Sequence, residues 1–267
     1  MTGSSGSGKK AVIYATGERG VYVGRLEKRF RRASVPATLL VSLDGDLEVR
    51  DPLTRERTTS RSVLIPSGTE LEYDTHGSQV VMFFLDPLGT DLARVRHLMR
   101  SVTPLGNQYV MQHLDGLSDV IQFANTLRNQ RPPLDTVIRI AEEWLSDPRR
   151  QVDAPDPRVL QAVQLLKTHY DRNISVEWVA AQVGLSVPRL SQLFRQVTGT
   201  SMRRFRLWHR IFVTAAELAR GTPLTEAAVH AGFSDYAQFS RTYRTLVGAC
   251  PSHARDNTEL HLTGFLV

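Results

Sequence analysis

The sequence predicts an α+β protein, with a small β-barrel in its N-terminal part and an all-helical C-terminal part. Short runs of β-branched and aromatic residues alternate with turn signals from Val12 to about Pro87, a pattern typical of strands. After Asp91 the apolar residues recur at the spacing of helices. Residues 175–252 contain an internal repeat in which each copy reads as helix, glycine turn and helix. These patterns place a sheet before a helical linker and two repeated helical units.

Seven candidate strands make up the predicted barrel. They are expected at Val12–Ala15, Val21–Leu26, Thr38–Leu43, Leu47–Arg50, Ser62–Ile65, Glu70–Tyr73 and Gln79–Leu85. Asp44, Gly45 and Asp46 separate two of these runs and predict a hairpin turn, because Gly45 can adopt a positive φ. Strands at this spacing indicate a small barrel or sandwich.

Two amphipathic helices follow the barrel and form a helical linker. Apolar residues share one face between Leu117 and Leu127, and again between Leu134 and Leu145. These faces predict either core packing within one chain or a dimerisation surface. The Asp-, Pro- and Arg-rich stretch 146–158 reads as a connecting segment.

The expected parts of the chain follow from these patterns. The first ten residues are rich in Gly and Ser and cannot bury enough surface to become ordered. We expect a disordered tail over 1–10, the barrel over 11–103, the helical linker over 104–155, the repeated helical domain over 156–256 and a tail over 257–267. The C-terminal tail is unusually apolar, and the sequence assigns no function to it.

The positive charge is concentrated in the C-terminal part. Residues 1–156 hold 20 Lys and Arg against 20 Asp and Glu, whereas residues 157–267 hold 13 against 7, which accounts for the whole net charge of +6. This asymmetry predicts a C-terminal part that faces a polyanion, with a merely basic domain as the alternative. Twelve of the 13 C-terminal cations are Arg, whose planar guanidinium suits phosphates and guanine edges.

The cysteine content and the lengths of the apolar runs indicate the cellular compartment of the protein. Cys250 is the single cysteine, so no disulfide within the chain and no Cys-based zinc finger can form. The longest apolar run, Val80–Leu85, falls far short of the roughly 18 residues that a membrane span needs. We therefore expect a cytoplasmic protein without a membrane partner.

The internal repeat is the strongest functional signal. Residues 179–186 return 48 residues later and residues 190–199 return 49 residues later, so one extra residue is expected early in the second helix of copy two. We call the copies unit one, about 176–197, and unit two, about 224–247. Two short helices cross at a steep angle only when their contact is small and the turn tolerates an unusual φ. The repeated alanine and glycine of each copy meet both needs.

Two further elements complete the repeat. Ser186 and Ser234 follow the glycine turns and are expected to cap the next helix. Met202–Arg220 has no Pro or Gly and predicts a linking helix about 28 Å long. Such a helix could hold the second helices of the two units about 34 Å apart, which is one turn of DNA.

The C-terminal hundred residues resemble the DNA-binding domain of AraC/XylS-type bacterial transcription regulators, which carries two helix-turn-helix units. The resemblance rests on the stretch Gly232–Arg241, followed by Tyr243, Arg244, Gly248 and Pro251. Thr214 and Ala254 depart from the usual alanine and aromatic residue of the family. The resemblance implies a regulator that reads two successive major grooves of promoter DNA, with RNA polymerase as a candidate partner.

The N-terminal part more loosely resembles the cupin-like barrel that many such regulators use for sensing or dimerisation. Ile65–Gly68 matches a Pro-x-Gly turn typical of these barrels. Metal-binding cupins use a His-x-His pair, but His76 is the only His before His97. We therefore expect a barrel that binds no metal and no cofactor. The resemblance also implies that the barrel binds a small-molecule effector and that the protein is a homodimer.

The second helix of each unit is expected to lie in the major groove, with its exposed residues facing the bases. Gln192 can pair with adenine, Arg195 with guanine or a phosphate, and Arg241 is the strongest candidate guanine reader. For Tyr236 helix packing is an equal alternative. The candidate DNA-contacting residues are Pro188, Arg189, Ser191, Gln192 and Arg195 in unit one, Tyr236, Ala237, Ser240, Arg241 and Arg244 in unit two, and the phosphate-tracking Arg203, Arg204, Arg206 and Arg210 on the linking helix.

Two other functional classes remain as alternatives. A cupin-type enzyme would need an acid–base or metal-binding cluster in the barrel, and the sequence offers no such spacing, so no catalytic residue and no enzymatic activity are expected. A partner-binding adaptor with an auxiliary DNA-binding module is the other alternative. The basic run Lys28, Arg29, Arg31 and Arg32 reads either as a site for an acidic ligand or, preferably, as a charged strand edge.

Overall fold

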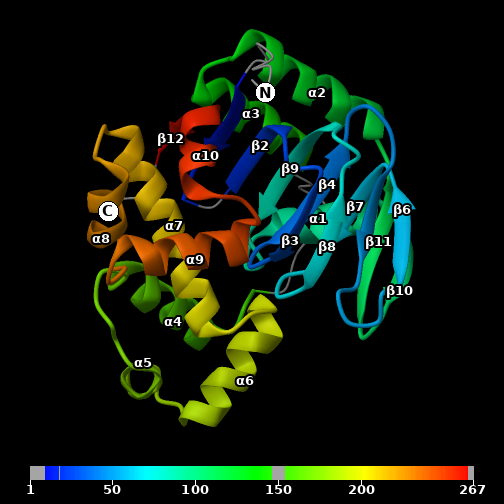
Figure 1. Ribbon diagram of the computed structural model, residues 1–267. Helices are drawn as coiled ribbons and strands as arrows, with labels where there is room; N and C mark the ends of the chain where they lie inside the picture. Colours follow the sequence, from blue (N-terminus) through cyan, green and yellow to red (C-terminus); the bar gives the residue numbers. More distant parts are fainter. Residues whose placement is uncertain (1–9, 18, 146–153, 264–267) are drawn as a thin grey trace.

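The computed structural model describes residues 10–17, 19–145 and 154–263 (Figure 1). The N-terminal part contains two sheets. In order across the sheet, the eight-stranded one consists of β10 (Met99–Leu105), β11 (Gln108–Leu114), β7 (Ser62–Ile65), β4 (Ala37–Ser42), β9 (Gln79–Leu85), β2 (Arg19–Arg25), β1 (Ala11–Ala15) and β12 (Thr258–Leu262). The four-stranded one consists of β3 (Arg29–Ala33), β8 (Glu70–Asp74), β5 (Leu47–Arg50) and β6 (Arg57–Ser60).

The large sheet is covered on both faces. One face meets the small sheet through a core that includes Leu40, Val63 and Met82. The other packs against α1 (Thr90–Leu98), α2 (Leu117–Gln130) and α3 (Leu134–Leu145). Every residue of β4 and β7 is consequently buried. The apolar faces of α2 and α3 supply this core, so core packing is the alternative that the fold uses.

The strands do not close into the predicted barrel. The seven predicted strands are present, but the structure adds β3 and β6 to the small sheet. Among the residues described, no strand of one sheet pairs with a strand of the other. The predicted hairpin at Asp44–Asp46 is also wrong, because it joins β4 to β5, which lie in different sheets. Gly45 is accordingly not among the glycines with positive φ. This turn is a corner between two layers.

A hairpin interrupts the helices expected after Asp91. β10 and β11 pair over six residue positions, so the predicted boundary between 103 and 104 falls inside β10. Residues alternate between buried and exposed along β10, since only one of its faces meets the core. The predicted connecting segment 146–158 and the tail 1–10 lie largely outside the described residues.

The C-terminal part contains seven helices among the described residues. They are α4 (Pro157–Thr168), α5 (Val176–Gln182), α6 (Val187–Thr198), α7 (Met202–Ala219), α8 (Leu224–His230), α9 (Tyr236–Val247) and α10 (Pro251–Asn257). α5 and α6 form unit one, α8 and α9 form unit two, and α7 is the linking helix. The extra residue of copy two lies in the turn, 231–235 against 183–186, and not in the second helix as predicted. None of the helices described is long and apolar enough to cross a membrane.

The last strand returns to the first. β12 runs parallel to β1 over five residue pairs and forms an edge of the large sheet. The segment expected to be a tail therefore completes the N-terminal fold as far as residue 263. Its apolar residues Leu260 and Leu262 face α7 and α9 across a small cavity. The pairing places the C-terminal helices directly against the sheet (Figure 1).

Candidate DNA-binding interface

Unit one presents the outer face of α6. The turn before it contains Gly184 at a φ of +67°, a conformation that glycine tolerates best. Leu190, Leu193 and Phe194 bury the inner face against α4, α5 and α7. All five candidate residues of this helix are exposed: Pro188, Arg189, Ser191, Gln192 and Arg195. The guanidinium of Arg189 donates to the Gln192 side-chain oxygen at 3.2 Å, so the two residues form one polar surface.

Unit two presents α9 in the same way but begins it differently. Asp235, not Ser234, is the N-cap, and its carboxylate accepts a hydrogen bond from the backbone NH of Gln238 at 2.6 Å. The Gln238 side-chain oxygen in turn accepts from the backbone NH of Ser234 at 2.9 Å. Because the Gln238 side chain bonds the residue before the N-cap, this is a variant of the capping box, and the backbone hydrogen bond from Gln238 lowers the pKa of Asp235. Ser186 does occupy the N-cap of α6, but its side chain makes no capping bond.

The candidate residues of α9 divide into two groups. Ala237, Arg241 and Arg244 are exposed, whereas Tyr236 and Ser240 are half-buried. The Tyr236 ring lies 6.1 Å from that of Phe239, so packing occupies at least part of this side chain. The exposed residues recur at helical spacing on the face opposite the buried Phe239.

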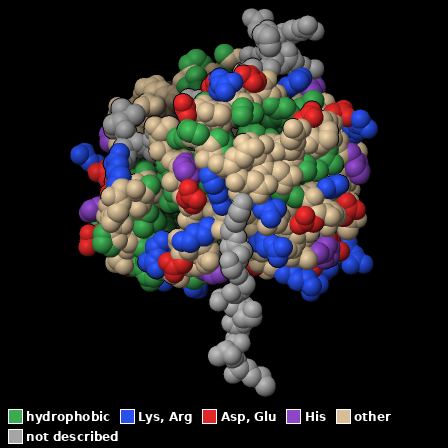
Figure 2. Space-filling model, turned by 90° about the horizontal axis from the view of Figure 1, so that it is seen from above, with side chains coloured by type: hydrophobic (Ala, Val, Ile, Leu, Met, Phe, Trp, Pro, Cys, Tyr) green, Lys and Arg blue, Asp and Glu red, His purple; other side chains and the backbone are tan. Residues whose placement is uncertain are grey.

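The charges of the two helices differ from those of other surfaces. Neither α6 nor α9 contains Asp or Glu, and each contains two Arg. On the face seen from above in Figure 2, by contrast, Lys and Arg are interspersed with Asp and Glu. A helix that carries only positive charge attracts a polyanion without local repulsion.

The linking-helix arginines have unequal roles, and the prediction for Arg210 is wrong. Its side chain is only 4% exposed, and it donates to the carbonyl oxygens of Tyr170 at 2.6 Å and Arg172 at 3.2 Å. Burial lowers its pKa to about 10. Arg206 is half-buried and donates to the carbonyl of Ile174 at 2.7 Å. Arg210 therefore braces the fold from inside and cannot reach a phosphate.

Gly232 leaves the space that the contact between Arg210 and Tyr170 needs. It has a φ of +88°, and a methyl group there would lie 2.7 Å from the Tyr170 carbonyl oxygen and 3.0 Å from the Arg210 guanidinium carbon. Among the linking-helix candidates, Arg203 is exposed and Arg204 is half-buried. These two remain candidates for phosphate contact.

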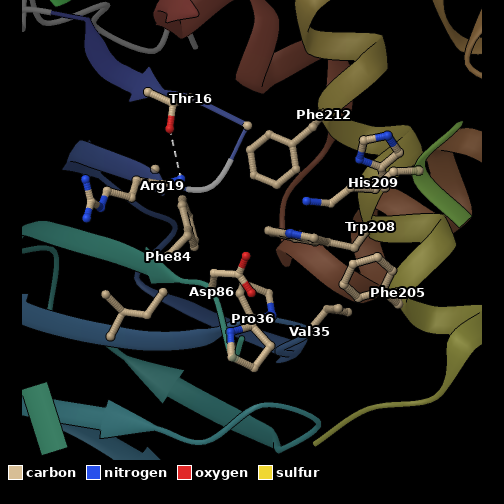
Figure 3. Close-up of a pocket in the computed structure, with 15 residues that line it drawn as sticks. Thr16, Arg19, Val35, Pro36, Phe84, Asp86, Phe205, Trp208, His209 and Phe212 are labelled. Atoms are coloured by element: carbon tan, nitrogen blue, oxygen red, sulfur yellow. Dashed lines mark hydrogen bonds between the residues drawn. The ribbon is translucent and has the colours of Figure 1, made fainter. Parts of the chain in front are cut away.

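A cavity of about 70 Å³ lies between the large sheet and α7 (Figure 3). Phe84 faces Trp208 and Phe212 across it, while Arg19 and His209 lie on its opposite sides. Burial lowers the pKa of His209 to about 4, with a smaller contribution from the nearby charge of Lys167. A second cavity of about 100 Å³ begins on the same Phe84 and Trp208 and extends along α9 and β12.

Arg32 lies behind Phe84 and has no carboxylate partner among the described residues. It is 3% exposed, and its guanidinium donates to the hydroxyls of Thr38 at 2.7 Å and Ser34 at 3.1 Å. Its Nε has no hydrogen-bond partner in the described part of the chain, and its guanidinium carbon lies 5.4 Å from the centre of the Phe84 ring. Burial lowers its pKa. Arg32 is thus not part of a charged strand edge, which Arg29 and Arg31 do form.

Comparisons of sequence with known proteins match the C-terminal part of the chain. A family model described as a helix-turn-helix domain matches residues 179–257. The arabinose operon regulatory proteins of Escherichia coli K12 and Salmonella typhimurium LT2 are 38% and 37% identical to the chain over 108 residues, which is 39% of this chain and 36% and 38% of theirs. The chain therefore matches little more than a third of the length of these relatives.

Solved structures match more of the chain. An apo variant of ToxT from Vibrio cholerae is similar over 90% of this chain and 97% of its own, with a TM-score of 0.61 and 14% identity. ToxT bound to an unsaturated fatty acid gives a TM-score of 0.57 at 14% identity over 90% and 96% of the two chains. This likeness establishes the shared arrangement of a sheet-rich part and a helical part.

Proposed function

The C-terminal part of the chain is a helix-turn-helix domain of the AraC type, and from this premise we propose that the protein is a sequence-specific DNA-binding transcription regulator. The observation that carries the proposal is the repeated helix pair, in which α6 and α9 each bury one face and expose an acid-free, arginine-bearing face. The major groove is wide enough to admit one such helix. The matched relatives are named as operon regulators, which favours regulation over catalysis or an adaptor role.

The proposed contacts follow the exposure of each side chain. We propose that Gln192 and Arg241, which are both exposed, read base edges, with adenine and guanine as their respective partners. Arg203, which is exposed, and Arg204, which is half-buried, are the proposed phosphate contacts between the two grooves. The remaining exposed candidates of α6 and α9 complete the interface.

Arg241→Ala is expected to weaken binding to the selected site by about 1–3 kcal/mol and to leave non-specific binding nearly unchanged. Arg203→Ala should weaken binding to every sequence and reduce the slope of log affinity against log salt by about 1. Duplexes selected by the full-length protein from a random pool, titrated at several salt concentrations, measure both effects. Equal losses for both variants on all sequences would refute the assignment of base and phosphate contacts.

We also propose that the N-terminal part binds an apolar carboxylic acid. ToxT structures contain an unsaturated fatty acid and, in another case, a naphthalenyl butenoic acid. In this chain, Phe84 separates the buried Arg32 from two cavities with largely apolar walls. A guanidinium without a carboxylate is costly to bury, and a ligand carboxylate would supply the missing partner once Phe84 turns aside.

Arg32→Met is expected to reduce the affinity for oleic acid at least about tenfold, because the charge-assisted hydrogen bonds to the carboxylate are lost. Without oleic acid the variant should be as stable as the wild type or more so. Calorimetric titration and thermal unfolding measure the two quantities. Arg31→Met, on the exposed neighbour whose side chain is 53% accessible, is the matched control. The idea fails if wild type and Arg32→Met bind oleic acid equally.

Further partners complete the proposal. A role at promoter DNA places the protein in the cytoplasm, with RNA polymerase as a candidate partner. A homodimer is expected from the family resemblance, although the apolar faces of α2 and α3 are covered by the sheet of the same chain. A dimer would therefore need a surface other than these covered apolar faces.

A further inference from the structure

Gly199 and Gly248 occupy the same position in the two copies of the repeat. They end α6 and α9 with φ values of +72° and +85°, and the backbone NH of each donates to the residue four positions before it. A positive φ explains why glycine ends each helix. It does not explain a second shared property, which is that both glycines touch the N-terminal part.

Gly199 meets the turn between β7 and β8. A methyl group on Gly199 would lie 2.7 Å from the Cβ atom of Ser67, and one on Gly68 would overlap the carbonyl oxygen of Gly199. The two backbones are therefore in direct contact. Among the described residues, the buried hydroxyls of Ser67 and Thr200 at this contact have no hydrogen-bond partner, which disfavours the contact.

Gly248 meets β3. A methyl group at this glycine would lie 2.7 Å from a ring carbon of Phe30, 3.2 Å from the carbonyl oxygen of Arg31 and 3.3 Å from the Cβ atom of Arg32. Phe30 is itself stacked on Tyr73 at 4.8 Å, so the ring is held in place by its own sheet. Figure 1 shows this end of α9 beside β3.

Unit two has a second attachment to the N-terminal part. α10 follows α9 after Gly248, and the chain then enters β12, which pairs with β1. The His261 ring stacks on Tyr14 at 4.6 Å with an angle of 13° between the planes. The backbone NH of Thr263 donates to the Ala15 carbonyl at 3.1 Å. Unit two is therefore attached to the N-terminal part at two places, through Gly248 on β3 and through β12 on β1.

These contacts leave the candidate DNA-contacting side chains free. Recognition helices read bases mainly with their N-terminal residues, whereas both contacts lie at the C-terminal ends of α6 and α9. Arg195 and Arg241 stay exposed although both helices are held. The contacts fix the positions of α6 and α9 without covering the side chains proposed to contact DNA.

We propose that the N-terminal part is a two-point clamp that sets the distance and angle between α6 and α9, and thereby the spacing of DNA half-sites that the protein accepts. The DNA consequence rests on the proposed function, whereas the clamp itself is a property of the fold. Two linked binding units gain affinity from each other only when their geometry lets both engage. One inserted base pair moves a half-site by about 3.4 Å and turns it by about a tenth of a turn. A rigid clamp makes that displacement costly.

A distance measurement tests the clamp without DNA. Spin labels at Gln196→Cys and Thr245→Cys, two exposed positions that are equivalent in the repeat, report the separation of α6 and α9 once Cys250 is replaced by Ser. We expect one narrow distance in the otherwise unchanged chain and a broadened distribution when Ser67→Phe wedges unit one away. Deleting residues 258–267 should also broaden it, because it removes β12 and leaves Gly248 as the remaining contact between unit two and the N-terminal part. Gly45→Phe is the control, because no described atom lies within 4 Å of a Cβ atom built at this position.

A spacing series tests the consequence for DNA. On duplexes chosen by the wild type, one inserted base pair between the half-sites should lower its affinity about tenfold, and this ratio should fall below about threefold for Ser67→Phe or for the truncated chain. Distance distributions that overlay the wild type in both variants would overturn the clamp. If the wild type selects no duplex, the proposed function fails, and the distances still decide the clamp.

Discussion

Arg210→Ala is expected to lower the free energy of unfolding by about 3 kcal/mol. The substitution removes a buried guanidinium that bonds the carbonyls of Tyr170 and Arg172, and it leaves both oxygens in a protein interior without that donor. It also removes the side chain that packs 5.9 Å from the centre of the Phe233 ring, in the core of unit two. Urea unfolding of the full chain measures the loss.

The control separates this internal role from a surface charge effect. Arg220 ends the same helix, with a side chain that is 60% exposed and paired with Glu217 at 3.5 Å. Arg220→Ala should change stability by no more than about 0.5 kcal/mol. The salt slope of non-specific DNA binding should be the same in Arg210→Ala and the wild type under conditions where both are folded. A slope reduced by about 1 would instead place Arg210 on a phosphate.

Arg210 also illustrates what periodicity predicts and what it does not. The sequence places four arginines within eight residues of α7, and helical spacing alone makes them appear as one basic surface. The role of Arg210 depends on the carbonyls of Tyr170 and Arg172, some 40 residues earlier in the chain. Such a partner is set by the packing of α4 against α7, which no local pattern records. The five candidate residues of α6, by contrast, follow from local helical spacing.

The strands also differ in whether local sequence or a distant partner determines them. The seven apolar runs were predictable because each carries its own β-branched or aromatic residues. β3 is not among these apolar runs because its sequence is mostly arginine, and the sequence indicates only a charged strand edge there. It is a strand because its charges are matched across β8, where Arg29 pairs with Asp74 at 2.6 Å and Arg31 with Glu70 at 2.8 Å. β12 was missed because it forms only against β1, some 250 residues away along the chain.

These long-range pairings explain why closure into a barrel was predicted and not found. Seven strands suffice to suggest closure when only spacing is known. The additional strands β3 and β12 instead occupy sheet edges, one beside α9 and the other beside α7. The edges that a barrel would have joined to each other are the ones that hold the C-terminal helices. The same sheet edges therefore leave the N-terminal fold open and attach it to the C-terminal helices.

Acidification is expected to destabilise the protein through His209. This imidazole lies on α7 at the cavity between the two parts, and its pKa is lowered to about 4, mainly by burial. Above pH of about 6.5 it is neutral in both the folded and the unfolded chain and contributes nothing to the pH dependence. Between about pH 6.5 and 4 the unfolded chain binds a proton that the folded chain does not. The free energy of unfolding therefore falls as the pH falls, by up to about 3 kcal/mol over this range.

His209→Gln isolates this contribution, since glutamine keeps a polar side chain and cannot take up the proton. All other titratable groups are common to both proteins and cancel in the difference. The gap between wild type and His209→Gln should therefore shift by up to about 3 kcal/mol in favour of the variant as the pH is lowered from 7 to 4. Urea unfolding at half-unit pH intervals measures it. Parallel stability curves would mean that His209 takes up its proton as readily in the folded chain, and that the contact between α7 and the sheet does not exclude water from this ring.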